Sequence, residues 1–364
     1  MQAGMRVLHL IDSLDTGGAE MMAVNISNAL ASEGDRIILC ASRRLGEIEN
    51  KVSSAVTLIC LNKRNSFDLR AFWTLLALVK KNNVSLIHAH SSSVFWALLV
   101  KFLTFSRTKV LWHDHFGNRV KEKTNVFMVL ASIWIDYILC VNFELCEWAK
   151  KNMWVKSDKI QYINNFPAIE FVRNEEIRNV KSFKIVYLAS FRNPKNHLNL
   201  VKAFELLLAH TPLDIRLILA GKFHQDSYFL ELYRYIQEKK LTDFIEFCGN
   251  VENVAELLAK VHIGVIASDF EGLPLSLLEY AQAELPVVVT DVGQCPEVIN
   301  HGEFGKVVEK NNPKALANGL LETVSNWPNS VKTGKAFKIH VDEFYGVKNF
   351  LNQYRSFVNM KNDQ

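Results

Sequence analysis

The segment Phe270–Ala281, FEGLPLSLLEYA, gives the clearest indication of the architecture of this chain. It follows the apolar run Val261–Ala267, which predicts a buried strand, and its glycine and proline mark a turn into a helix. Free backbone N–H groups at the start of such a helix attract anions. We therefore expect a diphosphate to bind at the backbone of Gly272, Leu273, Pro274 and Leu275.

Two carboxylates flank this predicted helix start. Glu271 lies in the turn, and Glu279 lies further along the helix among apolar residues. A carboxylate on an apolar face is costly unless it has a partner. Because carboxylates accept hydrogen bonds from vicinal hydroxyls, we expect Glu271 and Glu279 to bind separate parts of one elongated ligand, such as a sugar and a ribose.

Strands alternate with helices on both sides of this segment. In the second half, the strand Lys184–Ala189 precedes a helix at His197–His210 and a strand at Ile215–Ala220. The first half has the same pattern, beginning with the strand Arg6–Ile11 and the helix Ala19–Glu33. This alternation predicts an α/β protein with two doubly wound, Rossmann-like domains, which we expect to face a central cleft.

Composition of the connecting segments indicates where the domains divide. The polar run Arg173–Lys181 predicts a linker, and helical spacing returns at Val347–Met360. We expect an N-terminal domain at residues 1–170, a second domain at 171–335, and a C-terminal helix at 336–364 that returns to the first domain.

Three further loops carry candidate site residues. Gly17 and Gly18 follow the first strand, where paired glycines allow a ligand to approach the backbone closely. Arg192 and Lys195 follow the strand Lys184–Ala189, and cations there can neutralise a diphosphate. The segment Trp112–Gly117, WHDHFG, places two histidines, His113 and His115, after another strand.

Neither histidines nor cysteines predict a metal site. We cannot name further ligands at usable spacing for His113 and His115, and Ile87-His88-Ala89-His90 is a weaker feature of the same kind. None of the six cysteines forms a CxxC pair. We therefore expect no metal and no cofactor, and reduced cysteines typical of the cytosol.

Composition excludes several classes of protein. A chain of 364 residues with 49% hydrophobic and 22% charged residues forms ordinary folded domains. The net charge of +4 is too small to indicate a nucleic-acid partner. No apolar run is long enough to span a bilayer, which predicts a cytoplasmic location.

Taken together, these segments resemble glycosyltransferase family 4, the retaining transferases of the two-domain GT-B fold, over nearly the whole chain. The strongest match is the family's Glu-x7-Glu motif at Glu271 and Glu279, followed by LPVVVTDVGQCPEVI at Leu285–Ile299. The loop GGAE at Gly17–Glu20 and the loop FRNPKNH at Phe191–His197 are also similar to family segments.

The resemblance implies a role for each candidate residue. Glu271 contacts the donor sugar and Glu279 the ribose, while Arg192 and Lys195 hold the diphosphate. His113, or else His115, lies near the donor sugar. The implied activity is metal-independent transfer, with retention, from a nucleotide diphosphate sugar to a glycan or polyprenyl-linked acceptor in surface polysaccharide assembly. The absence of an Asp-x-Asp motif agrees with independence from metal.

Several alternatives remain open on the sequence. The chain could be a nucleotide-sugar epimerase or phosphorylase of the same fold, or a nucleotide-sugar-binding protein without catalysis. The apolar run Val94–Phe105, followed by cations up to Lys109, is interpreted either as a core helix with a basic end or as a segment that docks peripherally on a membrane.

Overall fold

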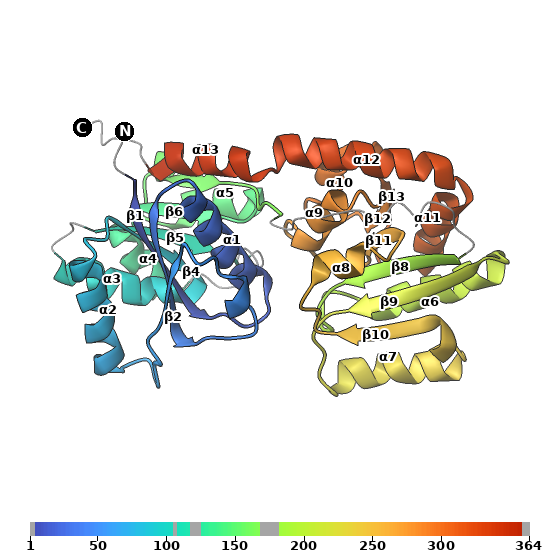
Figure 1. Ribbon diagram of the computed structural model, residues 1–364, viewed down its shortest axis with the longest axis horizontal. Coiled ribbons are helices and arrows are strands. Elements are labelled where there is room, and N and C mark those ends of the chain that lie inside the picture. The colour runs from blue at the N-terminus through green and yellow to red at the C-terminus, as the bar shows by residue number, and fades with distance from the viewer. Residues whose placement is uncertain (1–3, 105–107, 117–124, 168–181, 359–364) are drawn as a thin grey trace. The chain divides into compact units, whose positions relative to one another are not determined.

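The computed structural model describes residues 4–104, 108–116, 125–167 and 182–358. The chain divides into two compact units, Met1–Asn165 with Val347–Gln364 (unit 1) and Phe166–Gly346 (unit 2). Each unit has a parallel sheet with helices packed against it (Figure 1).

Unit 1 contains a seven-stranded sheet in the order β3-β2-β1-β4-β5-β6-β7, with every neighbouring pair parallel. Its strands are β1 (Arg6–Ser13), β2 (Arg36–Arg44), β3 (Thr57–Cys60), β4 (Leu86–His90), β5 (Lys109–Asp114), β6 (Tyr137–Cys140) and β7 (Ile160–Tyr162). Its helices are α1 (Gly18–Ser32), α2 (Leu69–Lys81), α3 (Val94–Leu103), α4 (Val126–Ala131), α5 (Phe143–Asn152) and α13 (Val347–Val358).

Unit 2 repeats this winding with a six-stranded parallel sheet in the order β10-β9-β8-β11-β12-β13. Its strands are β8 (Ser182–Leu188), β9 (Asp214–Ala220), β10 (Ile245–Gly249), β11 (Ile263–Ile266), β12 (Val287–Thr290) and β13 (Lys306–Val308). Its helices are α6 (His197–His210), α7 (Ser227–Glu238), α8 (Val254–Leu258), α9 (Leu275–Gln282), α10 (Cys295–Val298), α11 (Pro313–Ser325) and α12 (Trp327–Phe344).

The predicted α/β class with two Rossmann-like domains is confirmed. Central strands such as β11 and β12 are buried along their whole length, because helices cover both faces of each sheet. The sequence analysis did not name β3, β7 or β13, which are edge strands of three or four residues. Their runs are too short to show a hydrophobic period.

The boundaries of the units differ from the expected ones. The expected division between residues 335 and 336 falls inside α12, where Phe337 and Val341 are buried in the core of unit 2. Unit 2 therefore continues to Gly346. Of the expected C-terminal segment, the part that belongs to unit 1 among the described residues is α13. The other expected division, between 170 and 171, and the linker at Arg173–Lys181 lie outside the described residues.

Helix α13 packs on unit 1 through one face. Its buried residues include Phe350, Tyr354 and Phe357, and the Phe357 ring meets the Tyr137 ring of β6 edge to face. Of the helices in the described ranges, none is both long and apolar enough to cross a membrane.

Candidate functional site

The carboxyl edge of the sheet in unit 2 brings two of the predicted residues together. Strands β8 and β11 are neighbours, and the chain turns in opposite directions from them, so the loops that follow them meet at the switch point of the sheet. Lys195 comes from the first loop and Glu271 from the second. The Lys195 Nζ atom lies 2.7 and 2.9 Å from the two carboxylate oxygens of Glu271.

This ion pair is partly withdrawn from water. The side chain of Glu271 is 8% exposed and that of Lys195 is 20% exposed. A charge in such a place is costly to leave unpaired, and each of the two side chains gives the other a partner of opposite charge. An ammonium has three N–H donors, and at least one remains for another acceptor.

Buried hydroxyls hold the pair in place. The Ser268 hydroxyl donates to Glu271 at 2.5 Å and lies 2.8 Å from the Tyr187 hydroxyl. Tyr187, on β8, in turn donates to the Lys195 backbone carbonyl at 2.7 Å. Tyr187 and Ser268 are both fully buried. The loop positions of Lys195 and Glu271 are therefore coupled through two side chains that the sequence analysis did not identify.

A second link joins the same loops. The Asp269 backbone N–H donates to the Pro194 carbonyl at 2.8 Å, and the Asn196 amide donates to the Asp269 carboxylate at 2.7 Å. Asn196 also caps α6 through its side-chain oxygen, which accepts from the Asn199 N–H. The loop Phe191–His197 is thus held at Pro194 and at Asn196.

Other predicted residues of unit 2 lie in the two loops that carry this pair or on α9. Helix α9 begins at Leu275, and its N-cap residue, Pro274, makes no side-chain hydrogen bond to the first turn. Leu273 and Pro274 are buried, Gly272 and Leu275 half-buried. Glu279 is half-buried on α9, and Arg192 is exposed.

The residues after β12 support the loop that carries Glu271. Gly293 has a left-handed backbone with φ of +53°. A Cβ at this position would lie only 2.2 Å from the Glu271 carbonyl oxygen, and the Gln294 N–H donates to the Gly272 carbonyl at 3.0 Å. Glycine is therefore required here for both conformation and space.

In unit 1, five histidines gather at β1, β4 and β5. The β-sheet register pairs His9 with His88 and His90 with His113, and alternation along the strands puts them on one face with His115. The sequence pattern predicts His113 and His115 as site residues and His88 and His90 only weakly, and it does not predict His9. The spacing of two residues between His88 and His90, which puts both side chains on one face of a strand, was the available sequence signal for this cluster.

The imidazoles form two hydrogen-bonded chains. His88 Nε2 lies 3.2 Å from His113 Nδ1, and His88 Nδ1 lies 3.1 Å from the Tyr354 hydroxyl. In the second chain, His90 lies 3.1 Å from His9 and 3.0 Å from His115. Burial lowers the pKa of His9 and of His115 to about 3. Burial and the neighbouring histidines lower the pKa values of His88, His90 and His113 well below the usual range, so all five rings are neutral near pH 7.

On distance alone, two triads within the described residues could hold a metal ion. These are His9 with His88 and His90, and His90 with His113 and His115, each with ring nitrogens within 4.8 Å of one another. The structure thus supplies the neighbours that spacing in the sequence did not name. Neutral imidazoles are the form that binds Zn²⁺, but both ring nitrogens of His88 and of His90 already take part in hydrogen bonds.

The two glycines of the loop before α1 have different surroundings. Gly17 is the N-cap of α1, without a side-chain cap, and a Cβ there would lie 2.2 Å from a carboxylate oxygen of Glu20. Gly18 begins the helix, and a Cβ there would meet nothing within 4 Å. Of the two, Gly17 has the closer neighbour.

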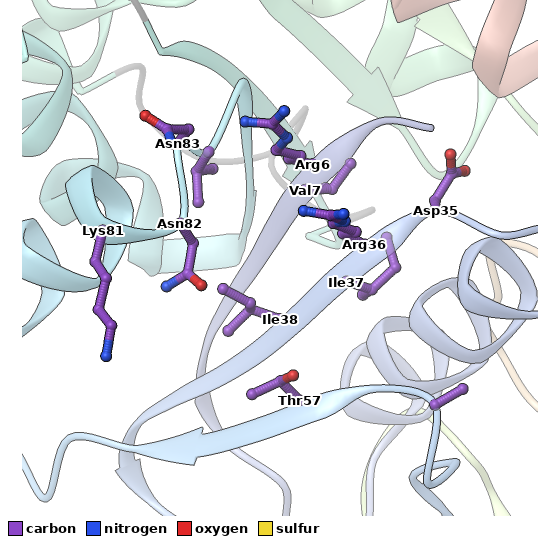
Figure 2. Close-up of a pocket in the computed structure, with 12 residues that line it drawn as sticks. Arg6, Val7, Asp35, Arg36, Ile37, Ile38, Thr57, Lys81, Asn82 and Asn83 are labelled. Carbon is purple, nitrogen blue, oxygen red and sulfur yellow. The ribbon is translucent and has the colours of Figure 1, made fainter. Parts of the chain in front are cut away.

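A hollow of about 500 Å³ lies at the opposite, amino edge of the sheet in unit 1 (Figure 2). Arg6, Arg36 and Lys81 line it, from the starts of β1 and β2 and the end of α2. Asp35, which also lines it, accepts hydrogen bonds from the Met5 N–H and from Arg355. Since ligands of parallel sheets bind at the carboxyl edge, this hollow is separate from the candidate site.

A first prediction concerns Gly293. Gly293→Ala is expected to lower the free energy of unfolding by about 3 kcal/mol, because it combines left-handed strain with displacement of the Glu271 backbone. Gly249→Ala is the matched control: its φ is +63°, but a Cβ there would have no neighbour closer than 3.9 Å. It should cost about 1 kcal/mol. Equal losses in urea unfolding would contradict the assigned clash.

A second prediction concerns the dependence of stability on pH. Because the folded pKa values of the five histidines lie below the unfolded value, the unfolded chain binds more protons once the pH falls below about 6.5, and stability should fall with it. His88→Gln should reduce this slope by up to about 1.4 kcal/mol per pH unit. Urea unfolding from pH 7.5 to 5.0 measures the slope for the wild type and for His88→Gln. An unchanged slope in His88→Gln would refute the assignment of His88 as a buried neutral ring.

Comparison with known proteins agrees with this geometry. The family model "Glycosyltransferase Family 4" matches residues 16–171, and "Glycosyl transferases group 1" matches residues 168–339. The capsular polysaccharide biosynthesis glycosyltransferase CapH of Staphylococcus aureus is 24% identical over 88% of this chain and 91% of its own length. N-acetyl-α-D-glucosaminyl L-malate synthase of Bacillus anthracis is 24% identical over 93% of each chain.

Solved structures share the architecture. Anabaena HepE, in complex with UDP and glucose, superposes with a TM-score of 0.78 over 97% of this chain and 99% of its own, at 17% identity. The two family models together span residues 16–339, and the likeness of fold agrees with them. The chain belongs to glycosyltransferase family 4 and has the GT-B fold.

Proposed function

We propose that this glycosyltransferase moves a sugar from a nucleotide diphosphate sugar, with retention and without a metal ion, onto a glycan or lipid-linked acceptor in surface polysaccharide assembly. The observation that carries the proposal is the half-buried Lys195–Glu271 pair at the switch point of unit 2. The similarity to a capsular polysaccharide glycosyltransferase supports the pathway, and the fold shared with a UDP-binding protein supports the donor class.

The leaving diphosphate requires positive charge, which the chain itself supplies in this proposal. Lys195 keeps at least one donor beyond those facing Glu271, and exposed Arg192 lies in the same loop. The start of α9, at Leu275, offers backbone N–H groups of a helix N-terminus. Preorganised donors of this kind stabilise developing negative charge.

Glu271 would act at the sugar end of the donor. Transfer passes through a state with positive charge near the anomeric carbon, and a carboxylate held in place stabilises that charge. Ser268 and Lys195 fix the Glu271 carboxylate, so it need not reorganise during the reaction. Glu279, four residues after the start of α9, is proposed to accept from the ribose hydroxyls.

Unit 1 is proposed to contribute to the binding of the donor sugar and of the acceptor. His113 is the candidate to contact the donor sugar, with half-buried His115 beside it at a ring-centroid distance of 4.0 Å. Gly17 and Gly18 would shape the loop at the start of α1. N-acetyl-α-D-glucosaminyl L-malate synthase is named for a small acid acceptor, so family likeness alone does not select a lipid-linked one.

A surface of unit 1, here called the apolar face, favours a lipid-linked acceptor. It comprises exposed apolar side chains of α2, α3, α4 and the two residues 133–134 after α4: Leu69, Trp73, Phe95, Leu99, Phe102, Val126, Phe127, Leu130, Ile133 and Trp134. Phe102 is 75% exposed and Phe127 is 78% exposed. Exposed aromatic side chains on helices are typical of contact with a membrane interface.

Charge around the apolar face agrees with an anionic membrane. The sequence has no acidic residue between Asp68 and Asp114, whereas α2 carries Arg70, Lys80 and Lys81. Cations beside apolar side chains are attracted to anionic lipids. We therefore propose peripheral docking of unit 1 on the cytoplasmic side of the membrane, where polyprenyl-linked acceptors would be met.

A third prediction tests transfer. With a UDP-, GDP- or ADP-sugar found by thermal shift, Lys195→Met and Glu271→Gln should each lower the transfer rate at least ~100-fold, because each removes preorganised charge. Lys239→Met, which breaks the 2.8 Å surface pair with Glu205, should stay within about twofold. EDTA should leave the rate unchanged, and the product should keep the donor's anomeric configuration.

Each arm of that experiment has a contrary result. Full activity in either variant would remove that residue from the site. Loss of transfer with EDTA would assign a metal role to the histidine triads instead. A product formed from a labelled donor without an acceptor would indicate an epimerase.

A fourth prediction tests the membrane. The wild-type chain should float with vesicles that contain about 30% anionic phospholipid, and less so as salt rises. The double variant Phe102→Ser, Phe127→Ser should lose most of this flotation. Leu230→Ser, Ile339→Ser removes two exposed apolar side chains from unit 2 and should not change it. Equal flotation of both double variants would exclude the apolar face as the docking surface.

A further inference from the structure

One of the two imidazole chains ends on a hydroxyl that fixes its direction. Tyr354, on α13, is fully buried, and within the described part of the chain His88 Nδ1 is the hydrogen-bond partner of its hydroxyl, at 3.1 Å. Burial raises the pKa of Tyr354 above its ordinary value, so the phenol keeps its proton. A buried O–H without an acceptor is costly, so the Tyr354 hydroxyl must donate to His88.

This direction passes on to the next ring. His88 is neutral, since burial and its histidine neighbours lower its pKa, and a neutral imidazole carries a single N–H. With Nδ1 accepting from Tyr354, that proton lies on Nε2. The His88 Nε2–H then donates to His113 Nδ1, which lies 3.2 Å away.

The same reasoning fixes the tautomer of His113. Its pKa is lowered by burial and by His115, so this ring is also neutral. Because Nδ1 accepts from His88, its proton must lie on Nε2. His113 Nε2 is buried and has no hydrogen-bond partner among the described residues. A buried N–H in this state calls for an acceptor, and an oxygen of a bound ligand supplies one.

We propose that Tyr354 and His88 are positioning residues that hold His113 as an Nε2–H donor toward an oxygen of the donor sugar. The identity of that ligand rests on the proposed function, whereas the tautomer does not. The opposite tautomer would present a bare nitrogen, which repels a sugar oxygen unless a hydroxyl donates to it. Helix α13 thus influences recognition of the sugar through the Tyr354 hydroxyl.

The tautomer can be measured in the unliganded full-length chain. Long-range ¹H–¹⁵N correlation spectra at pH 7.5, with His113 assigned from the signals lost in His113→Gln, should show a neutral Nε2–H ring. Tyr354→Phe keeps the ring but removes the donor, and should shift His113 to a mixture of tautomers. Tyr137→Phe removes a hydroxyl that contacts Lys109 in the same unit and should change nothing. An Nδ1–H ring in the wild type, or an unaltered spectrum in Tyr354→Phe, would overturn the proposal.

Kinetics give a second, separate measurement. A glutamine at position 88 can accept from Tyr354 and donate to His113, whereas a leucine can do neither. His88→Leu should lower kcat about 10- to 100-fold with little change in UDP binding, and His88→Gln should recover most of it. Equal rates in the two variants would refute positioning through hydrogen bonds. Should the wild type transfer no sugar, the proposed function fails, and the tautomer spectrum still decides the assignment of Tyr354 and His88.

Discussion

Parallel pairing of the strands is the constraint on which this molecule depends. In each sheet all described strands run in one direction, so the loops that follow them emerge at a single edge. Residues far apart in sequence meet there, and no local signal shows which of them are neighbours. Lys195 and Glu271 come into contact in this way in unit 2, and His9, His88 and His113 do so in unit 1.

The two units meet the cost of burying polar groups at this edge differently. Unit 2 keeps a charged pair and stabilises it with hydroxyls from Ser268 and Tyr187. Unit 1 keeps its imidazoles neutral and joins them to each other and to Tyr354. Charge suits a site that must meet a diphosphate, whereas neutral rings suit hydrogen bonding to an uncharged sugar. The difference follows the division of labour that we propose between donor phosphates and donor sugar.

The transfer that we propose at a membrane also requires a surface beyond the reacting groups. The apolar face of unit 1 and the adjacent cations of α2 would meet lipids, while the sheets themselves remain covered by helices. The hollow beside Arg6 and Arg36 lies at the amino edge and is thus removed from the histidines. The apolar face belongs to helices and the residues after α4, which vary within a fold without disturbing its sheets.

The sequence by itself determined the α/β class, the two Rossmann-like halves and the family, because buried parallel strands and the Glu271–Glu279 motif are local patterns. It also placed Lys195 and His113 at strand ends. Only the tertiary structure decided which of these residues have partners. Tyr187, Ser268 and Tyr354 act across 80 or more positions in the chain, and Gly293 matters through a backbone that approaches from another loop. Contacts of this kind depend on sheet order and side-chain packing, which no short window of sequence contains.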